Sequence, residues 1–275
     1  MYIINKLQEK MAVQYYFAHT GSDKKSAFAV IAHGLAGYKE EKMLQCVKNI
    51  FLKNGISVLM YDARFSLGDS DGPLENACFS HFIEDLNTII QWAKTQSFYT
   101  NPFYLCGHSL GAGACLHYAI NNPQDIAGII TLSAVYNGIF LKQSYMQNKP
   151  DFMREWQEKK YLNRIRSDNP QKYGKIAYTH LADACQYQLE KSADKITAPT
   201  LVVCGDADIS STIDHNMILK NAIGNNAKLT IIKSCGHTYK TQQNQTDLLL
   251  VLGLGLGLLL SLGLVLVLGF GSGLD

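Results

Sequence analysis

Short apolar runs alternate with amphipathic stretches along the first part of the chain. Residues Ala27–Ala32 (AFAVIA) and Ile56–Tyr61 (ISVLMY) are apolar almost throughout, which is typical of strands buried on both faces of a parallel sheet. The same signal predicts further strands at residues 11–18, Phe103–Cys106, Thr200–Cys204 and Lys228–Lys233 and within Ile126–Val135. Apolar residues at helical spacing lie between the strands, at Lys39–Lys53, His81–Ala93 and from about Leu110 onward. This alternation predicts an α/β fold with a mostly parallel central sheet flanked by helices.

The alternation of predicted strands and helices is interrupted between residues 136 and 198. Within this stretch, Asp151–Ile165 has the spacing of an amphipathic helix. An insertion late in a parallel sheet would lie over the carboxyl ends of the strands, where open α/β sheets bind ligands. We therefore expect residues 1–135 and 199–246 to form the core, and residues 136–198 to form a helical cap. A surface excursion without a binding role is the alternative.

The last segment, residues 247–275, has a different composition. From Leu248 to Phe270 it carries no charge and consists almost entirely of Leu, Val and Gly. Its 23 residues are long enough to span a bilayer as a helix. However, its glycines lower helix propensity, and no basic residues flank it. Three interpretations stay open: a membrane anchor, a terminal helix packed on the sheet, or a low-complexity end without function.

Composition and charge narrow the function classes. The 275 residues suit one large α/β domain, and a net charge of +2 with scattered Lys and Arg argues against a nucleic-acid partner. The seven cysteines lack close pairing and metal-ligand spacing. Residues 1–10 mix charged with apolar residues, unlike a signal peptide. We expect a cytoplasmic protein with free thiols and without metal or cofactor, for which membrane association would come only through the apolar tail.

The pentapeptide GHSLG at Gly107–Gly111 introduces candidate chemistry. It matches the nucleophile-elbow pattern G-x-S-x-G. The pattern needs small residues two positions before and after the serine, because the serine backbone is strained and neighbouring side chains would collide. The pentapeptide lies between a predicted strand and a predicted helix, whose N-terminus favours developing negative charge. This context predicts Ser109 to be a nucleophile; a tight turn with an ordinary serine is the alternative.

A serine hydroxyl needs a base within reach to act as a nucleophile. The pattern places an acid and then a histidine downstream of the serine. His237, in the sequence CGHT after the strand at Lys228–Lys233, is the candidate base. The acid should follow the strand at Thr200–Cys204, where GDAD offers Asp206 and Asp208. The usual spacing favours Asp208, which would orient the imidazole, and Asp206 is the alternative.

Two backbone N–H groups are expected to form an oxyanion hole. One belongs to Leu110, directly after the nucleophile. The second is assigned to Leu35, in the glycine-rich sequence HGLAG that follows the strand at Ala27–Ala32 and whose backbone can approach a ligand closely. His33 is expected to be a structural hydrogen-bonding residue, and His108 a packing residue.

Together these motifs resemble the α/β-hydrolase superfamily, and within it uncharacterised bacterial hydrolases similar to esterases and serine aminopeptidases. The resemblance covers about residues 28–239, in the order HGLAG, YDARFSLGDSDG, GHSLGA, CGDAD and CGHT. It implies the α/β-hydrolase fold and a serine nucleophile. Many relatives carry D-x-R-G-x-G-x-S in the second motif. Here the segment from Asp62 to Ser70 has an extra residue and lacks the first glycine, which bears on the loop and the shape of the pocket.

The sequence therefore predicts a serine hydrolase that cleaves a carboxylic ester of a small-molecule acyl substrate through a Ser-His-Asp triad and an acyl-enzyme. An aminopeptidase or thioesterase on the same triad is one alternative. A free amine would need an acidic residue in the pocket, for which Glu155 and Glu158 are candidates. A membrane-tethered, non-catalytic binding protein is the alternative from a different class, and the apolar tail motivates it.

Overall fold

The computed structural model describes residues 1–18, 26–166 and 169–268. Within them, the central feature is an eight-stranded sheet with the order β1-β2-β4-β3-β5-β6-β9-β10. Its strands are β1 (Tyr2–Ile4), β2 (Lys10–Tyr16), β3 (Ala27–Ala32), β4 (Ile56–Tyr61), β5 (Phe103–His108), β6 (Ile126–Leu132), β9 (Thr200–Gly205) and β10 (Ala227–Ile232). Neighbouring strands from β4 to β10 are parallel, whereas β2 and β1 add to the edge antiparallel. The expected α/β fold is confirmed.

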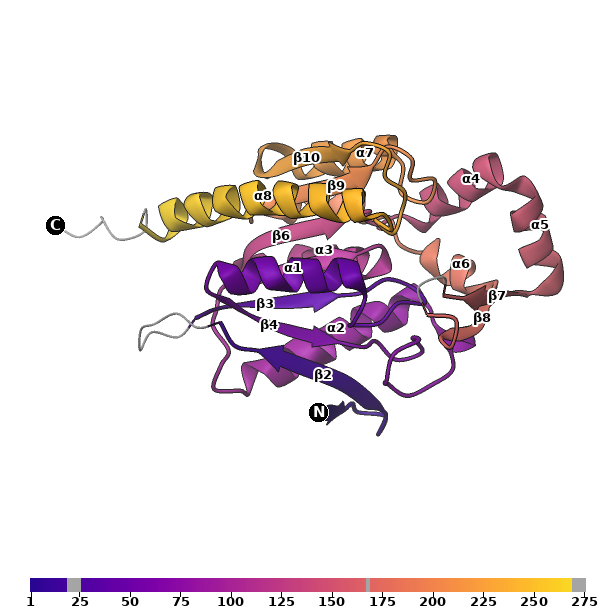
Figure 1. Ribbon diagram of the computed structural model, residues 1–275, viewed down its shortest axis with the longest axis horizontal. Coiled ribbons are helices and arrows are strands. Elements are labelled where there is room, and N and C mark those ends of the chain that lie inside the picture. Colours follow the sequence, from indigo (N-terminus) through magenta and orange to yellow (C-terminus); the bar gives the residue numbers. More distant parts are fainter. Residues whose placement is uncertain (19–25, 167–168, 269–275) are drawn as a thin grey trace.

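Helices cover both faces of the sheet. α1 (Lys42–Lys53) and α8 (Gln242–Leu268) lie side by side on one face, and α2 (Phe79–Lys94), α3 (Leu110–Asn121) and α7 (Ile213–Ile223) lie on the other (Figure 1). A large apolar cluster fills the space under each helical layer. Strands β4, β5 and β9 lie between the two clusters and bury every residue. Burial on both faces is the reason why these strands have little or no hydrophobic alternation.

The described part of residues 136–198 forms helices and strands that project beyond the carboxyl ends of the sheet strands, together with a 3-10 segment that packs against α3 and α7 (Figure 1). They comprise α4 (Gly138–Asn148), α5 (Pro150–Lys159), β7 (Tyr161–Ile165), β8 (Tyr173–Ala177), α6 (Thr179–Ala184) and the 3-10 segment Leu189–Lys195. The helix expected over Asp151–Ile165 is therefore wrong in its second part. Lys160 adopts a left-handed conformation with φ of 64°, which ends α5, and the following residues pair antiparallel with β8. Cross-strand pairing of this kind leaves little trace in local periodicity.

The leucine-rich C-terminal segment is part of the second apolar cluster. Leu248, Leu252 and Leu256 of α8 are fully buried there. A Cβ on Gly255 would come within 2.4 Å of a methyl carbon of Leu201, so this glycine allows α8 to approach β9 closely. Up to residue 257, the segment is a terminal helix packed on the sheet, which was one of the three interpretations. Residues 269–275 lie outside the described residues. In the described part of the chain, no helix combines the length and apolar character needed to cross a membrane.

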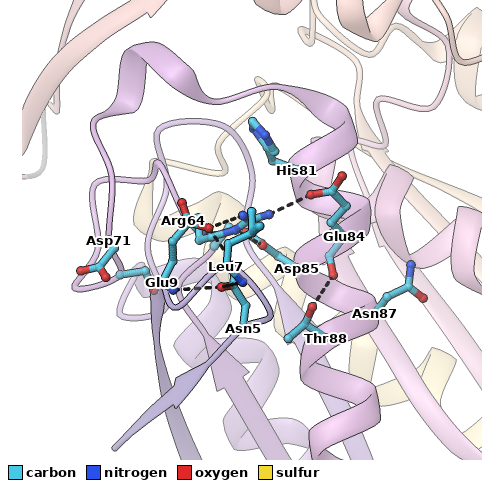
Figure 2. A network of polar contacts seen from close by, with 12 residues as sticks. Asn5, Leu7, Glu9, Arg64, Asp71, His81, Glu84, Asp85, Asn87 and Thr88 are labelled. Atoms are coloured by element: carbon cyan, nitrogen blue, oxygen red, sulfur yellow. Dashed lines mark hydrogen bonds and ion pairs between the residues drawn. The ribbon is translucent and has the colours of Figure 1, made fainter.

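The YDARFSLGDSDG segment is held by a network around Arg64 (Figure 2). The Arg64 guanidinium binds Asp85 of α2 at 2.6 Å and Glu84 at 2.9 Å, and it also binds Glu9 from the turn between β1 and β2. The backbone N–H of Arg64 donates a second hydrogen bond to Asp85 at 2.7 Å. Burial raises the pKa of Asp85 to about 6, against the opposing effect of the Arg64 charge. The network joins the sheet edge, the loop after β4 and α2.

Candidate active site

Ser109 lies at the sharp turn where β5 passes into α3. Its φ of 54° and ψ of −120° are strained for a residue with a side chain. Two flanking glycines make this turn possible. A Cβ on Gly107 would lie 2.5 Å from the backbone of Ala112, and a Cβ on Gly111 would lie 2.3 Å from the carbonyl oxygen of His33. The G-x-S-x-G spacing therefore has a steric cause in this structure.

His237, Ser109 and Asp208 form a hydrogen-bonded chain. His237 Nε2 lies 2.9 Å from Ser109 Oγ, and His237 Nδ1 lies 2.8 Å from Asp208 Oδ2. With Nδ1–H donating to the carboxylate, Nε2 is left to accept from the serine hydroxyl. Asp208 comes from the loop after β9, and His237 from the loop after β10. The three residues predicted as a set therefore meet at the carboxyl ends of the strands.

The two candidate acids have different surroundings. Asp208 is only 4% exposed, and its Oδ1 accepts the backbone N–H groups of Ser210 at 2.8 Å and Ser211 at 2.9 Å. Burial raises the pKa of Asp208, but the His237 charge, the His237 hydrogen bond and the Ser211 N–H outweigh it, so the net pKa is lowered. Asp206 is exposed, and its carboxylate accepts the N–H of Cys235 at 3.3 Å. The structure brings Asp208 to His237 and directs Asp206 elsewhere.

His108 does more than fill space. Its Nε2–H donates to the carbonyl oxygen of His237 at 2.8 Å and so ties the His237 loop to the residue before Ser109. Burial, followed by the nearby His237 charge, lowers the pKa of His108 to about 3, so its ring stays neutral at neutral pH. This role is not predictable from the sequence, because the contact joins segments 129 residues apart. The position beside Ser109 was the only available signal.

The loop with Leu35 is packed against the serine turn. A Cβ on Gly34 would come within 2.8 Å of the Ser109 Cβ, so this glycine permits the close approach. Gly34, Leu35, Ser109 and Leu110 line the same cavity. The two residues predicted to supply oxyanion donors therefore lie around the candidate nucleophile.

Buried polar contacts fix this loop. His33 Nε2 accepts the backbone N–H of Ala63 at 2.9 Å, while its Nδ1–H donates to the carbonyl oxygen of Gly34 at 2.8 Å. Asp62 accepts from both the backbone N–H and the Nζ of Lys39, each at 2.7 Å. The Leu35 loop is thereby tied to the loop after β4. His33 makes the structural hydrogen bonds that were expected of it. The buried Lys39–Asp62 pair was not predicted from the sequence.

A cavity of about 930 Å³ opens in front of Ser109. The segment 136–198 supplies much of its wall, through apolar side chains from α4, α5, β7 and β8: Leu141, Tyr145, Phe152, Trp156, Leu162 and Ile176. Trp156 is also fixed by a hydrogen bond from its ring N–H to the carbonyl oxygen of Ile176 at 3.0 Å. The arrangement provides a nucleophile, a base and an acid beside a largely apolar chamber, which suits acyl transfer.

All seven cysteines are free thiols in the structure, four of them buried. Within the residues that the structure describes, no group of three His, Cys, Asp or Glu side chains could hold a metal ion.

Comparisons with known proteins agree on the family and the fold. The family model described as serine aminopeptidase, S33, matches residues 23–243. Est1E from Butyrivibrio proteoclasticus, solved with ferulic acid bound, has a TM-score of 0.75 at 21% identity over 95% of this chain and 99% of its own. Mouse alpha/beta hydrolase domain-containing protein 10 has a TM-score of 0.70 at 17% identity, covering 92% and 96%.

The esterase EaEST from Exiguobacterium antarcticum has a TM-score of 0.65 at 17% identity, covering 93% of this chain and 98% of its own. At such identities these likenesses concern the fold. No curated protein sequence is significantly similar to this chain.

Proposed function

Because the chain belongs to the serine aminopeptidase S33 family of α/β hydrolases, we propose that it is a serine hydrolase that cleaves carboxylic esters. The observation that carries the proposal is the hydrogen-bonded chain from Ser109 through His237 to Asp208, beside a cavity that Ser109 and His237 line. That chain provides what a hydroxyl needs to become a nucleophile at neutral pH.

In the proposed reaction, His237 Nε2 takes the hydroxyl proton as Ser109 Oγ attacks the ester carbonyl carbon. The carbonyl oxygen becomes an oxyanion and accepts the N–H groups of Leu35 and Leu110. Asp208 stays ionised and stabilises the imidazolium. The intermediate then collapses, the bond to the alcohol oxygen breaks, and His237 gives its proton to that oxygen. Water attacks the acyl-enzyme in the same way, His237 again serving as base, and releases the acid and free Ser109.

An ester substrate is favoured over a peptide with a free amino terminus. Two of the similar structures are named as Est1E with ferulic acid and as an esterase. A free amine would need an available carboxylate in the cavity. Glu155 lines the cavity but binds Lys159 at 2.7 Å, and Glu158 is absent from the described lining. The acidic residues considered for an aminopeptidase therefore do not supply a free partner for an amine.

Active-site labelling tests the proposal directly. A fluorophosphonate probe is expected to modify Ser109 of the intact chain, as mapped by peptide mass spectrometry. Short-chain aryl esters are expected to be hydrolysed, and Ser109→Ala is expected to lower kcat on the order of 10⁶-fold and to abolish labelling. Ser97→Ala, at an exposed turn after α2, is the matched control and should retain both.

A folded chain that resists the probe, with equal esterase activity before and after Ser109→Ala, would overturn the proposal. A folded chain that neither reacts with the probe nor hydrolyses any ester would favour the non-catalytic binding protein instead. Hydrolysis of aminoacyl amides in preference to aryl esters would move the chain to the aminopeptidase alternative.

A further inference from the structure

The wall of the active-site cavity carries an excess of positive charge. Its cations come from α5, β7, the residues flanking these elements and the loop after β10: Lys149, Lys159, Arg164, Arg166 and Lys240. Two carboxylates, Glu41 and Glu155, line the same cavity. Each is already bound within the wall, Glu41 to Arg166 at 2.5 Å and Glu155 to Lys159 at 2.7 Å.

A second cavity of about 310 Å³ continues from the first. The two share lining residues that include His108 and Thr238, the chain neighbours of Ser109 and His237, so the second cavity adjoins the one that Ser109 lines. Arg164 and Lys240 line both cavities, and Lys42 lines the second. Among the described residues, no carboxylate forms an ion pair with any of these three cations.

Lys42, Arg164 and Lys240 come from three separate parts of the fold. Lys42 begins α1, Arg164 lies in β7 and Lys240 follows the His237 loop. Glu41 and Arg166 also line both cavities, but they bind each other, so positive charge stays in excess. A cleft with an excess of one sign of charge attracts the opposite sign. Arg and Lys are the residues that bind carboxylates and phosphates most strongly, through charge-assisted hydrogen bonds.

We propose that the substrate is an ester that also carries an anionic group, a carboxylate or a phosphate, held by Lys42, Arg164 and Lys240. The inference rests on the proposed ester hydrolysis and names its substrate class. The anion accepts hydrogen bonds from these cations while the ester carbonyl lies against Ser109. The same charges repel a free amine, which adds discrimination against peptide substrates.

Two matched pairs of esters test the inference and distinguish where the anion sits. The first pair differs in the acyl group, para-nitrophenyl hemiglutarate against para-nitrophenyl valerate. The second differs in the alcohol, para-carboxyphenyl butyrate against phenyl butyrate. In at least one pair, kcat/KM is expected to favour the anionic ester by about tenfold or more, because only the anionic ester accepts a hydrogen bond from a charged group. Added salt should reduce this preference.

Charge-removing variants identify the residues. Arg164→Gln and Lys240→Gln are each expected to lower the anionic-over-neutral ratio of kcat/KM about tenfold, the scale of one charged hydrogen bond. Lys42→Gln is expected to lower it as well. Lys53→Gln, at the exposed opposite end of α1, is the matched control and should leave the ratio unchanged.

The two proposals fail in different ways. If Ser109-dependent hydrolysis shows no preference for either anionic ester, the inference is overturned and the esterase stands. If no ester is cleaved and the probe does not label Ser109, the proposed function fails. Calorimetric binding of the same esters to Ser109→Ala then decides the inference: tighter binding of an anionic member supports it, and equal binding rejects it.

Discussion

Single residues in this site are distinguished by their surroundings rather than by their type. Asp206 and Asp208 are both carboxylates in the loop after β9, two positions apart. Asp208 is buried and holds His237 Nδ1 at 2.8 Å, while Asp206 is exposed and accepts from Cys235. The backbone N–H groups of Ser210 and Ser211 keep the Asp208 carboxylate in place. Only Asp208 is therefore positioned to orient the imidazole.

Replacing Asp208 by Asn is expected to separate these roles. The amide has the shape of the carboxylate but does not select the correct imidazole tautomer or stabilise the imidazolium, so kcat for an aryl ester should fall by about 10⁴-fold. Asp206→Asn is the matched control and should change kcat less than about threefold, since it only weakens one long hydrogen bond away from His237. Steady-state kinetics with both purified variants checks this. Equal losses in the two variants would contradict the assignment.

Ser109, His237 and Asp208 could be predicted together because each depends on a local rule. Glycines two positions before and after Ser109 mark the nucleophile turn. The acid and the base each follow a strand that the sequence predicts. Other site contacts join distant segments by packing alone. The His108–His237 hydrogen bond and the Lys39–Asp62 pair leave no pattern in either segment. Such contacts become visible only when the sheet order is known.

At the scale of elements, the terminal helix α8 packs on the sheet as the other flanking helices do, although its sequence is unusually rich in leucine and glycine. Its buried leucines recur every four residues, at 248, 252 and 256, and they contact the face of the sheet that α1 also covers. The intervening Leu254 is 81% exposed. The buried face of α8 could not be identified from the sequence, because residues on both faces of the helix are equally apolar.

Shortening one buried leucine is expected to weaken the whole domain. Leu252→Ala leaves a cavity under α8 and should lower the free energy of unfolding by about 2–5 kcal/mol. Leu254→Ala, two positions along on the exposed face, is the matched control and should change it by less than about 0.5 kcal/mol. Denaturant unfolding of the intact chain measures both values. A loss at Leu254 as large as that at Leu252 would mean that α8 does not pack on the sheet in solution.

The elements between residues 136 and 198 show where prediction from local pattern stops. The start of α5 was predictable, because Pro150 and the apolar spacing both mark it. Its end at Lys160 and the β7–β8 pairing depend on a partner strand eight or more residues away. The Arg164 side chain reaches the cavity only because of that pairing.

At the scale of the whole molecule, the parallel sheet was the most predictable feature, since burial on both faces produces a continuous apolar run. The same burial also encloses several histidines. Burial lowers the pKa of His108 to about 3 and that of His180 to about 4, and it lowers that of His33 as well. These rings stay neutral in the folded chain while their unfolded counterparts take up protons below about pH 6.5.

The buried histidines give the stability a defined dependence on pH. Between about pH 6.5 and 4, the unfolded chain binds more protons at these histidines than the folded chain, so the free energy of unfolding falls as the pH falls. Asp85 acts in the opposite sense. Burial raises its folded pKa to about 6, above the unfolded value of about 3.9, so the folded chain gains protons there first. Burial also lowers the pKa of His117 and His215, so five histidines oppose this one carboxyl. The net expectation is a loss of stability on acidification.

Two variants with opposite expected signs test this balance. His180→Gln removes one neutral buried ring and should reduce the slope of unfolding free energy against pH, between pH 6 and 4.5, by up to about 1.4 kcal/mol per pH unit. Asp85→Asn removes the opposing group and should steepen the slope, even though loss of its bond to Arg64 lowers stability at every pH. Urea unfolding across this range measures both slopes, and the slope separates titration from simple destabilisation. A slope left unchanged by His180→Gln would show that the ring is protonated in the folded chain, which its 3% exposure and its packing against Trp156 oppose.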